Sequence, residues 1–311
     1  MLNKRYTYHL IIFFTVIFSF TALSGAEMTG FNFLRTNVGA RPSAIAGAFV
    51  SINGDINSVY YNPAGISGLN SRVVSASYLN HVLDIQSGII SYGQPVKDIG
   101  VVGVGINYMD YGSFDRTNKN GEKLGTFSAS SLVLSSSLAR ELISGLKGGL
   151  TLKYIRSVID DYSAQAVAFD VGLIYHPNFT EGLDIGIAAL HIGQATSAFI
   201  DTKEDLPTKL VAGFSKQLAH LPLMFNANVY KYVDNDVEFL VGGEFTLAEG
   251  LFLRFGYNSI GADQQVGGSY DSIAGFSAGL GFSRNDYMID YSFSSLGQVG
   301  GLNRISFSAA F

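Results

Sequence analysis

A strict alternation of apolar with small or polar residues along most of the chain is the feature that most constrains its fold. Residues 302–311 read LNRISFSAAF, and the segments 251–258, 273–283 and 285–294 follow the same pattern. A period of two is the period of a β-strand, whose successive side chains point to opposite faces. Each segment therefore predicts a strand with one face in an apolar medium and the other toward small or polar groups.

Two environments produce such strands: the shared core of a soluble sandwich, and a membrane barrel whose apolar face contacts lipid. Charged residues make up only 14% of the 311 residues, against about 25% in ordinary soluble domains. The polar face of the strands is rich in Gly and Ser, whereas a water-exposed face normally carries more charge. An open sheet edge is also excluded in lipid, because unpaired backbone groups are costly there. These observations favour a closed barrel.

The expected strands number about fourteen, and the connections between them differ by parity. Those after even-numbered strands are short, whereas several after odd-numbered strands, such as 112–123 and 194–207, are longer and mostly polar. Such asymmetry is typical of outer-membrane barrels. The sequence therefore predicts an all-β fold, a transmembrane antiparallel up-and-down β-barrel. The expected strands are 72–80, 84–94, 99–111, 124–138, 146–156, 164–176, 182–193, 208–217, 221–233, 236–247, 250–258, 272–283, 285–294 and 302–311.

The N-terminus has the pattern of a cleaved export signal. Lys4 and Arg5 precede an apolar stretch at 10–20, and small residues follow at 24–26. This order of positive, apolar and small residues predicts a signal peptide at 1–26. The alternative, an N-terminal membrane anchor, would need a longer apolar run to span a bilayer. We therefore expect a protein that is exported to the outer membrane of a diderm bacterium.

Residues 27–71 lack the alternation that follows them. Small residues at 44–48 permit close packing, and Asn62-Pro63 marks a turn or a break. A compact segment before a barrel is most simply a plug in its lumen, so we expect a plug at 27–71 and the barrel at 72–311. The terminal Phe311 resembles the signal that the barrel assembly machinery reads.

The run GARPSAIAGAFVSINGDINSVYYNPAGISGL at 39–69 resembles the N-terminal signature of the PorV/PorQ family, within the FadL-like group of outer-membrane proteins. It departs from that signature at 54–57, where a more acidic stretch is expected. The resemblance implies a fourteen-stranded barrel with its N-terminal segment folded inside. FadL-like relatives move hydrophobic compounds, whereas PorV escorts cargo proteins in type IX secretion. The motif residues are Gly39, Arg41, Asn62, Pro63, Ala64 and Gly65.

No catalytic or metal-binding constellation is present in the sequence. There is no Cys, and none of the five His has metal-ligand spacing. His176 and His191 are expected at an interface or in a loop. A net charge of −5 gives no reason to expect nucleic-acid binding. We therefore expect no enzyme activity and no metal or organic cofactor.

Several ionisable residues fall on the polar phase of their strands. A charge on the lipid face would cost about 2–4 kcal/mol near the midplane, so these side chains are expected in the lumen. Either they pair with one another and with the plug residues Arg35, Arg41 and Asp55, or they form a polar constriction on a ligand path. Arg41 is the expected anchor between plug and wall, since a guanidinium binds a carboxylate through two parallel hydrogen bonds. The expected lumen charges are Lys153, Asp170, Glu238, Glu244, Arg254, Asp290 and Arg304.

Within the plug, Phe49, Tyr60 and Tyr61 are candidates to line an apolar pocket. The turn at 62–65 is either a fixed exit from the lumen or a movable element near a gate. Three functions follow: passive transport of small hydrophobic molecules, a surface secretion component that binds cargo proteins, and a purely structural barrel. Transport is the preferred hypothesis. The expected partners are outer-membrane lipid, the barrel assembly machinery, and a hydrophobic small molecule or secreted cargo.

Overall fold

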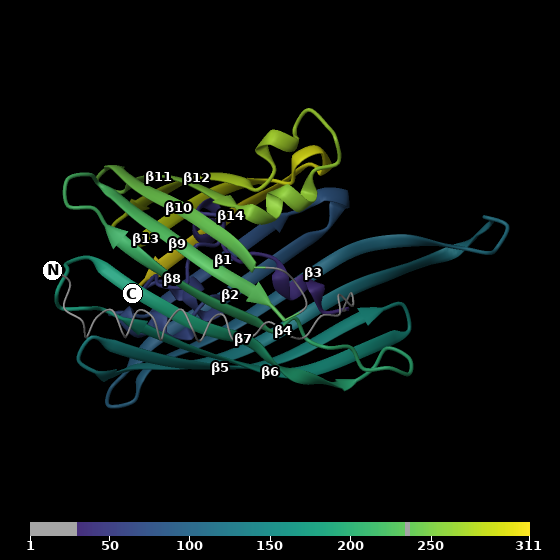
Figure 1. Cartoon of the computed structure of the whole chain (residues 1–311). Helices are drawn as coiled ribbons and strands as arrows, with labels where there is room; N and C mark the ends of the chain where they lie inside the picture. Colours follow the sequence, from purple (N-terminus) through teal and green to yellow (C-terminus); the bar gives the residue numbers. More distant parts are fainter. Residues whose placement is uncertain (1–29, 234–236) are drawn as a thin grey trace.

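The computed structural model describes residues 30–233 and 237–311, apart from the side chains of residues 262 and 263. The predicted signal peptide lies outside the described residues. In the described part, fourteen antiparallel strands form a closed barrel, in which each strand pairs with the next and β1 pairs with β14 (Figure 1). The strands are β1 Val73–Asn80, β2 Gln86–Val96, β3 Gly100–Thr117, β4 Lys123–Ile143, β5 Leu146–Ile159, β6 Tyr162–Tyr175, β7 Leu183–Ser197, β8 Lys209–Gln217, β9 Leu223–Tyr232, β10 Val237–Ala248, β11 Leu251–Asn258, β12 Phe276–Arg284, β13 Tyr287–Ser295 and β14 Gly301–Ala310.

Short helices occupy the segment before β1 and some of the loops. Before β1 lie η1 Asn32–Arg35, α2 Ala40–Ala44, η2 Ile56–Tyr60 and η3 Pro63–Gly68. The loops contain η4 Val82–Asp84, η5 Ser259–Gln264, η6 Asp271–Ile273 and η7 Gly297–Val299. Across residues 30–233 and 237–311, no helix has the length and apolar character needed to span a bilayer.

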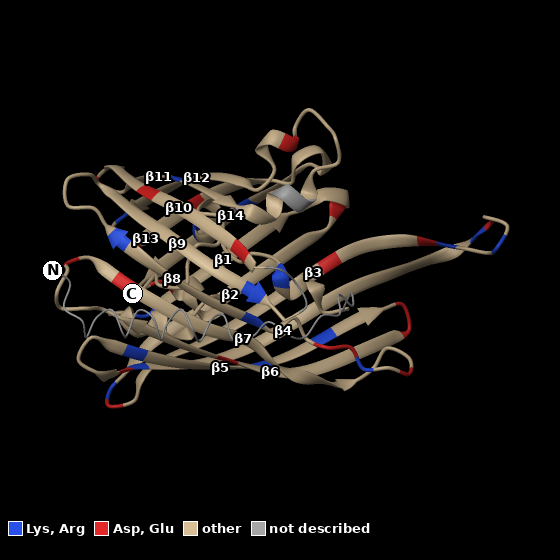
Figure 2. Ribbon diagram, in the orientation of Figure 1, with Lys and Arg blue, Asp and Glu red and all other residues tan. Residues whose placement is uncertain are grey.

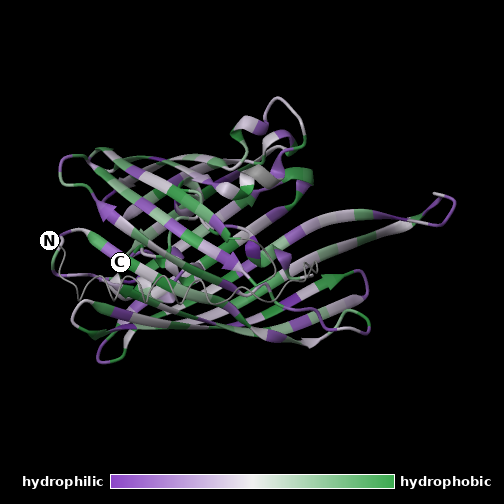
Figure 3. Cartoon of the chain, viewed as in Figure 1, coloured by the Kyte–Doolittle hydropathy of each residue, from purple (hydrophilic) through white to green (hydrophobic). Residues whose placement is uncertain are grey.

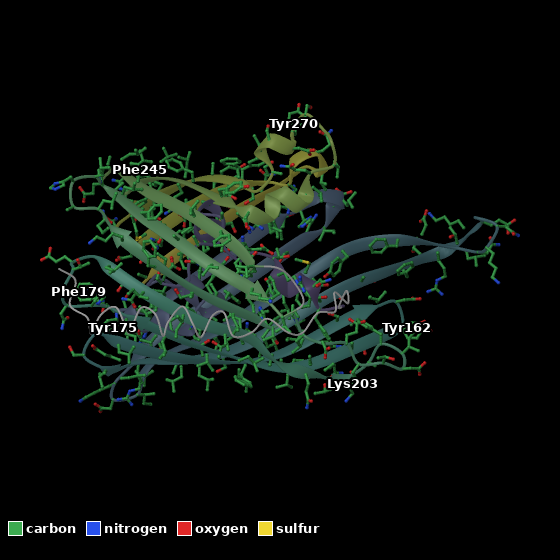
Figure 4. The ribbon with its side chains drawn as sticks, in the orientation of Figure 1. Tyr162, Tyr175, Phe179, Lys203, Phe245 and Tyr270 are labelled. Carbon is green, nitrogen blue, oxygen red and sulfur yellow. The ribbon has the colours of Figure 1, made fainter. Side chains whose placement is uncertain are left out.

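The two faces of the wall have opposite character. Along β5, Leu150, Leu152 and Tyr154 are exposed, while the intervening Thr151 and Lys153 are buried. Hydrophobic and hydrophilic residues alternate along many of the strands in Figure 3, and in Figure 2 charged residues are sparse along the strands of the barrel. Exposed Tyr175 lies near the end of the barrel that has the short turns, and exposed Tyr162 lies near the other end (Figure 4). An apolar band with aromatic residues toward both ends is the exterior that a lipid bilayer requires.

The predicted closed barrel and its strand order are confirmed, but several strands are longer than predicted, β3 and β4 by the most. The expected loop at 112–123 is mostly strand, because β3 continues to Thr117 and β4 begins at Lys123. Beyond Asp110 these strands pair with each other and not with β2 or β5, so they form a projecting hairpin (Figure 1). Phe114 stacks on Phe127 across this hairpin, with ring centroids 5.4 Å apart. This cross-strand aromatic pair stabilises strand structure in a stretch that is polar enough to read as a loop.

The segment before β1 lies inside the barrel as a plug. Helix α2 packs against β11 to β14, and η3 packs against β3 to β6 on the other side of the lumen. Glycines in the wall make room for it. A Cβ on Gly186 would lie 2.3 Å from the carbonyl oxygen of Val50, and a Cβ on Gly149 would lie 2.4 Å from the backbone of Ala64. The wall therefore touches the plug backbone directly at these points.

This contact predicts that Gly186→Val destabilises the barrel by about 1–3 kcal/mol, the usual cost of overpacking. The matched control is Gly88→Val, because a Cβ at Gly88 meets nothing within 4 Å. Urea unfolding in lipid vesicles measures both changes. Equal stability of the two variants would show that the plug does not press on the wall at Gly186.

Candidate functional site

A network of ion pairs, partly buried at Arg41 and fully buried at Arg254, fastens the plug to the wall. From the plug, the Arg41 Nε and Nη2 atoms each donate to one carboxylate oxygen of Glu244 on β10, both at 2.8 Å. Its third nitrogen, Nη1, lies 2.8 Å from Asp55 Oδ2 in the plug. Burial alone would lower the pKa of the Arg41 guanidinium, but the carboxylates of Glu244 and Asp55 outweigh burial and raise that pKa. Arg41 therefore stays charged.

The network continues into the wall through Arg254 on β11. This side chain is 0% exposed and donates to Glu244 at 2.5 Å and to Asp290 on β13 at 2.6 Å. The predicted lumen charges Glu244, Arg254 and Asp290 thus lie together, linked to the plug through Arg41. Pairing among these groups compensates the cost of taking them out of water.

Asn62 fastens the other side of the plug. Its buried side-chain amide donates to the carbonyl of Val50 at 2.6 Å and to the wall carbonyls of Leu173 and Ile187 at 3.0 and 3.3 Å. Its Oδ1 accepts a hydrogen bond from Ala64 N at 3.1 Å and caps η3, whose first residue is Pro63. An Asn just before a helix and a Pro at its first position are both preferred at helix N-termini.

The two glycines of the motif, Gly39 and Gly65, permit backbone arrangements that a side chain would prevent. Gly39 has φ +80°, a conformation that favours glycine, and it precedes Ala40, whose N–H donates to Ser306 Oγ on β14 at 2.8 Å. A Cβ on Gly65 would lie 2.4 Å from the carbonyl oxygen of Ile52. The motif residues therefore shape the plug and attach it to the wall.

The three aromatic candidates have different positions. Phe49 is fully buried and packs on Tyr61 with ring centroids 5.3 Å apart, inside the plug. Tyr61 shares hydrogen bonds of 2.9 Å with the backbone of Val38, while the Tyr60 hydroxyl lies 3.0 Å from Ser91 Oγ. Burial raises the pKa of Tyr60 to about 12. Tyr60 and Tyr61 line a cavity, whereas Phe49 belongs to the plug interior.

A second ionic cluster lies in the wall between β5 and β7. Lys153 Nζ lies 2.5 Å from Asp170 Oδ2 and 3.2 Å from His191 Nδ1. The backbone N–H of His191 donates to the other Asp170 oxygen at 2.8 Å. His191 has φ +57° at a point where the β6–β7 register shifts. The expectation of an interfacial or loop histidine at 191 is wrong, because this bulge turns the side chain into the lumen, where it is buried.

Two cavities adjoin the plug. The larger measures about 250 Å³ and the smaller about 40 Å³. Their wall residues include Lys209, the first residue of β8, and Tyr232, the last of β9. The cavities thus extend toward the end of the barrel that has the longer loops. Both are lined by Arg35, Thr36, Asn37, Lys209 and Tyr232.

The geometry suits passage or binding of a small molecule. Among the described residues, no group of His, Asp and Glu side chains could hold a metal ion.

Alternation in the sequence predicted the inward charges, but it contained no indication of the cavities. These depend on where η1 and the loop helices stop, which only the folded chain determines.

The ion network predicts that Arg41→Ala weakens attachment of the plug. Removing one partner of a buried pair costs about 3–5 kcal/mol, because Glu244 loses two hydrogen bonds. We expect a lower unfolding midpoint in urea and faster proteolysis within residues 30–70. The control is Lys123→Ala, whose partner is Asp115 and whose ion pair is more than half exposed, so that its loss costs about 0–1 kcal/mol. An Arg41→Ala protein as stable as this control would contradict the anchor role.

For Asn62→Ala, we expect local loosening, because the carbonyls of Val50, Leu173 and Ile187 lose their donor and η3 loses its cap. A lost cap costs about 1 kcal/mol, and unsatisfied buried carbonyls add about 1–3 kcal/mol. Hydrogen exchange of the η3 amides measures the effect. Asn120→Ala, in the exposed tip of the hairpin, is the control. Unchanged protection of η3 in Asn62→Ala would show that this contact does not hold the turn.

No protein-family model and no curated protein sequence matches this chain. Solved structures match over most of its length. The toluene transporter TbuX of Ralstonia pickettii has a TM-score of 0.63 at 14% identity, covering 88% of this chain and 98% of TbuX. The toluene transporter TodX of P. putida has a TM-score of 0.59 at 13% identity, covering 88% and 99%. A FadL homologue of Pseudomonas aeruginosa has a TM-score of 0.58 at 12% identity, covering 89% and 99%.

At these identities the likeness concerns the fold alone, and it leaves the finer resemblance to PorV/PorQ unconfirmed. The chain therefore shares the closed fourteen-stranded barrel fold, within its described residues, with FadL-type hydrocarbon transporters.

Proposed function

We propose that this chain is an outer-membrane barrel through which small hydrophobic compounds pass passively, around a plug that stays in place. The observation that carries the proposal is the pair of adjoining cavities beside the plug, which share the lining residues Arg35 to Asn37. The structurally similar TbuX and TodX are described as toluene transporters. That description supports the proposal by likeness of fold.

Outer-membrane residence is part of the proposal. The apolar exterior requires lipid, and a closed barrel leaves no strand edge unpaired in it. A signal peptide at 1–26 would direct export, and Phe311 would serve the barrel assembly machinery. No cofactor is needed, because passive passage requires only a path and a gradient.

A stationary plug follows from how it is held. Arg41 binds the wall on one side of the lumen, and Asn62 binds it on the other. Displacing the plug would break both attachments and expose buried charges. A path beside η1, through the cavities, leaves these contacts intact.

The first test obstructs that path at Thr36, which lines both cavities. We expect Thr36→Trp to slow uptake of labelled toluene at least about fivefold in diderm cells that express the chain, because an indole fills the junction. Asn32→Trp is the control, since Asn32 is exposed in the same segment. Toluene entry at the same rate with both variants, or without the protein, would refute the proposed transport role.

The second test asks whether the plug moves. The chain has no native cysteine, and the backbone nitrogen of Ala40 lies 2.8 Å from Ser306 Oγ. Ala40→Cys with Ser306→Cys places two thiols at this contact between plug and wall, and a gel-mobility difference with and without dithiothreitol selects the protein in which they are cross-linked. We expect toluene uptake in the oxidised and reduced states to agree within about twofold. Each single cysteine variant is the control for oxidation itself. A block that dithiothreitol reverses would show that the plug must shift.

The alternative is a PorV-like secretion component that binds cargo proteins at the cell surface. The projecting β3–β4 hairpin is the feature that favours it, because residues 113–117 and 123–128 extend past the neighbouring strands. Replacing residues 113–127 by a short turn separates the two functions. Loss of surface cargo with normal toluene uptake would favour secretion, whereas normal display of cargo would favour transport.

A further inference from the structure

The guanidinium of Arg304 is a buried cation that has no carboxylate partner in residues 30–233 and 237–311. Arg304 lies on β14, is 3% exposed and lines the larger cavity. Its Nη1 makes a long hydrogen bond of 3.4 Å to Ser294 Oγ, and its buried Nε has no hydrogen-bond partner. Within the described residues it forms no ion pair. This differs from Arg41 and Arg254, which each bind two carboxylates.

A second cation, the ammonium group of Lys209, lines the same cavity. It lies 3.8 Å from the centre of the Tyr230 ring and 5.3 Å from that of Tyr232. The ring faces attract a cation but do not saturate its three N–H donors. The carboxylate of Glu238 acts on Lys209 electrostatically while accepting a hydrogen bond from the Tyr230 hydroxyl. Lys209 makes no ion pair within the part of the chain that the structure describes.

Two such cations, in a cavity that the guanidinium of Arg35 also lines, call for an anion. A buried charge is costly unless it is paired and hydrogen-bonded, and a guanidinium and an ammonium together match the oxygens of a carboxylate. We propose that the larger cavity binds the carboxylate of a small organic acid through Arg304 and Lys209. This inference rests on the proposed transport function, for which it names the chemical class of the cargo.

The adjoining cavity indicates the rest of the molecule. Its lining combines the apolar side chains of Phe33, Val38, Val133 and Leu190 with polar ones that include Lys153 and His191. The apolar part of this lining suits the ring of a ligand. At about 250 Å³, the larger cavity is smaller than the roughly 300–1,000 Å³ usual for drug-sized ligands. A short aromatic acid, with its carboxylate in the larger cavity and its ring toward the smaller one, fits both linings.

The test is binding of benzoate to the purified full-length protein in detergent, measured by calorimetry, beside its neutral analogue benzamide. We expect benzoate to bind at least tenfold more tightly than benzamide. Arg304→Gln and Lys209→Gln should each raise the benzoate dissociation constant at least tenfold and leave benzamide unchanged. The matched controls are Arg140→Gln and Lys203→Gln, at exposed positions that line neither cavity; Figure 4 labels Lys203.

Equal binding of benzoate and benzamide, or unchanged benzoate binding in both cavity variants, would overturn the proposal. Binding of inorganic phosphate without benzoate would overturn the assignment to an organic acid. Folding of each variant is checked by the shift in gel mobility on boiling, and Lys209→Gln carries the test if Arg304→Gln does not fold. The two proposals can fail separately. If these variants lose benzoate binding while Thr36→Trp leaves toluene uptake unchanged, the carboxylate site is supported and only the transport proposal is refuted.

Discussion

The bidentate pair between Arg41 and Glu244 is the interaction on which the arrangement of the lumen depends. A closed barrel of this size has an interior that its own wall side chains do not fill, so a separate segment has to occupy it. Burying that segment takes charged groups out of water, which is tolerable only if each meets an opposite charge. Arg41 meets Glu244 and Asp55, and Arg254 links Glu244 to Asp290. The plug and one side of the wall are thereby a single charge-paired unit.

Much of the fold is predictable from the sequence, because one periodic signal determines it. Alternation along a segment, as at 302–311, specifies both the strand and which of its faces points inward. The same pattern in other segments predicts the inward direction of Lys153, Glu244 and Arg254. Alternation does not predict the structure where local contacts determine it. The hairpin beyond Asp110 is strand because Phe114 and Phe127 stack, and His191 turns inward because a bulge interrupts β7.

The plug and its cavities are less predictable, because nothing periodic encodes them. Asn62 is recognisable as a turn residue, but its bonds to Leu173 and Ile187 join positions more than a hundred residues apart in sequence. Phe49 and Tyr61 are similar in type, yet one packs within the plug and the other borders a cavity. Arg254, which binds two carboxylates, and Arg304, which meets none in the described part of the chain, likewise look alike in sequence. Only the register of neighbouring strands decides which of them meets a carboxylate.

The hydroxyl of Ser306 bears on the order in which the molecule assembles. It accepts a hydrogen bond from Ala40 of the plug and lies 2.6 Å from the hydroxyl of Ser77 on β1. It therefore stands at the seam where the first and last strands meet. This seam has the largest sequence separation of any strand pair in the barrel, so its closure is entropically the slowest pairing. Because the plug directly precedes β1, we expect it to enter the lumen before the seam shuts, with closure of the wall and capture of the plug as one kinetic event.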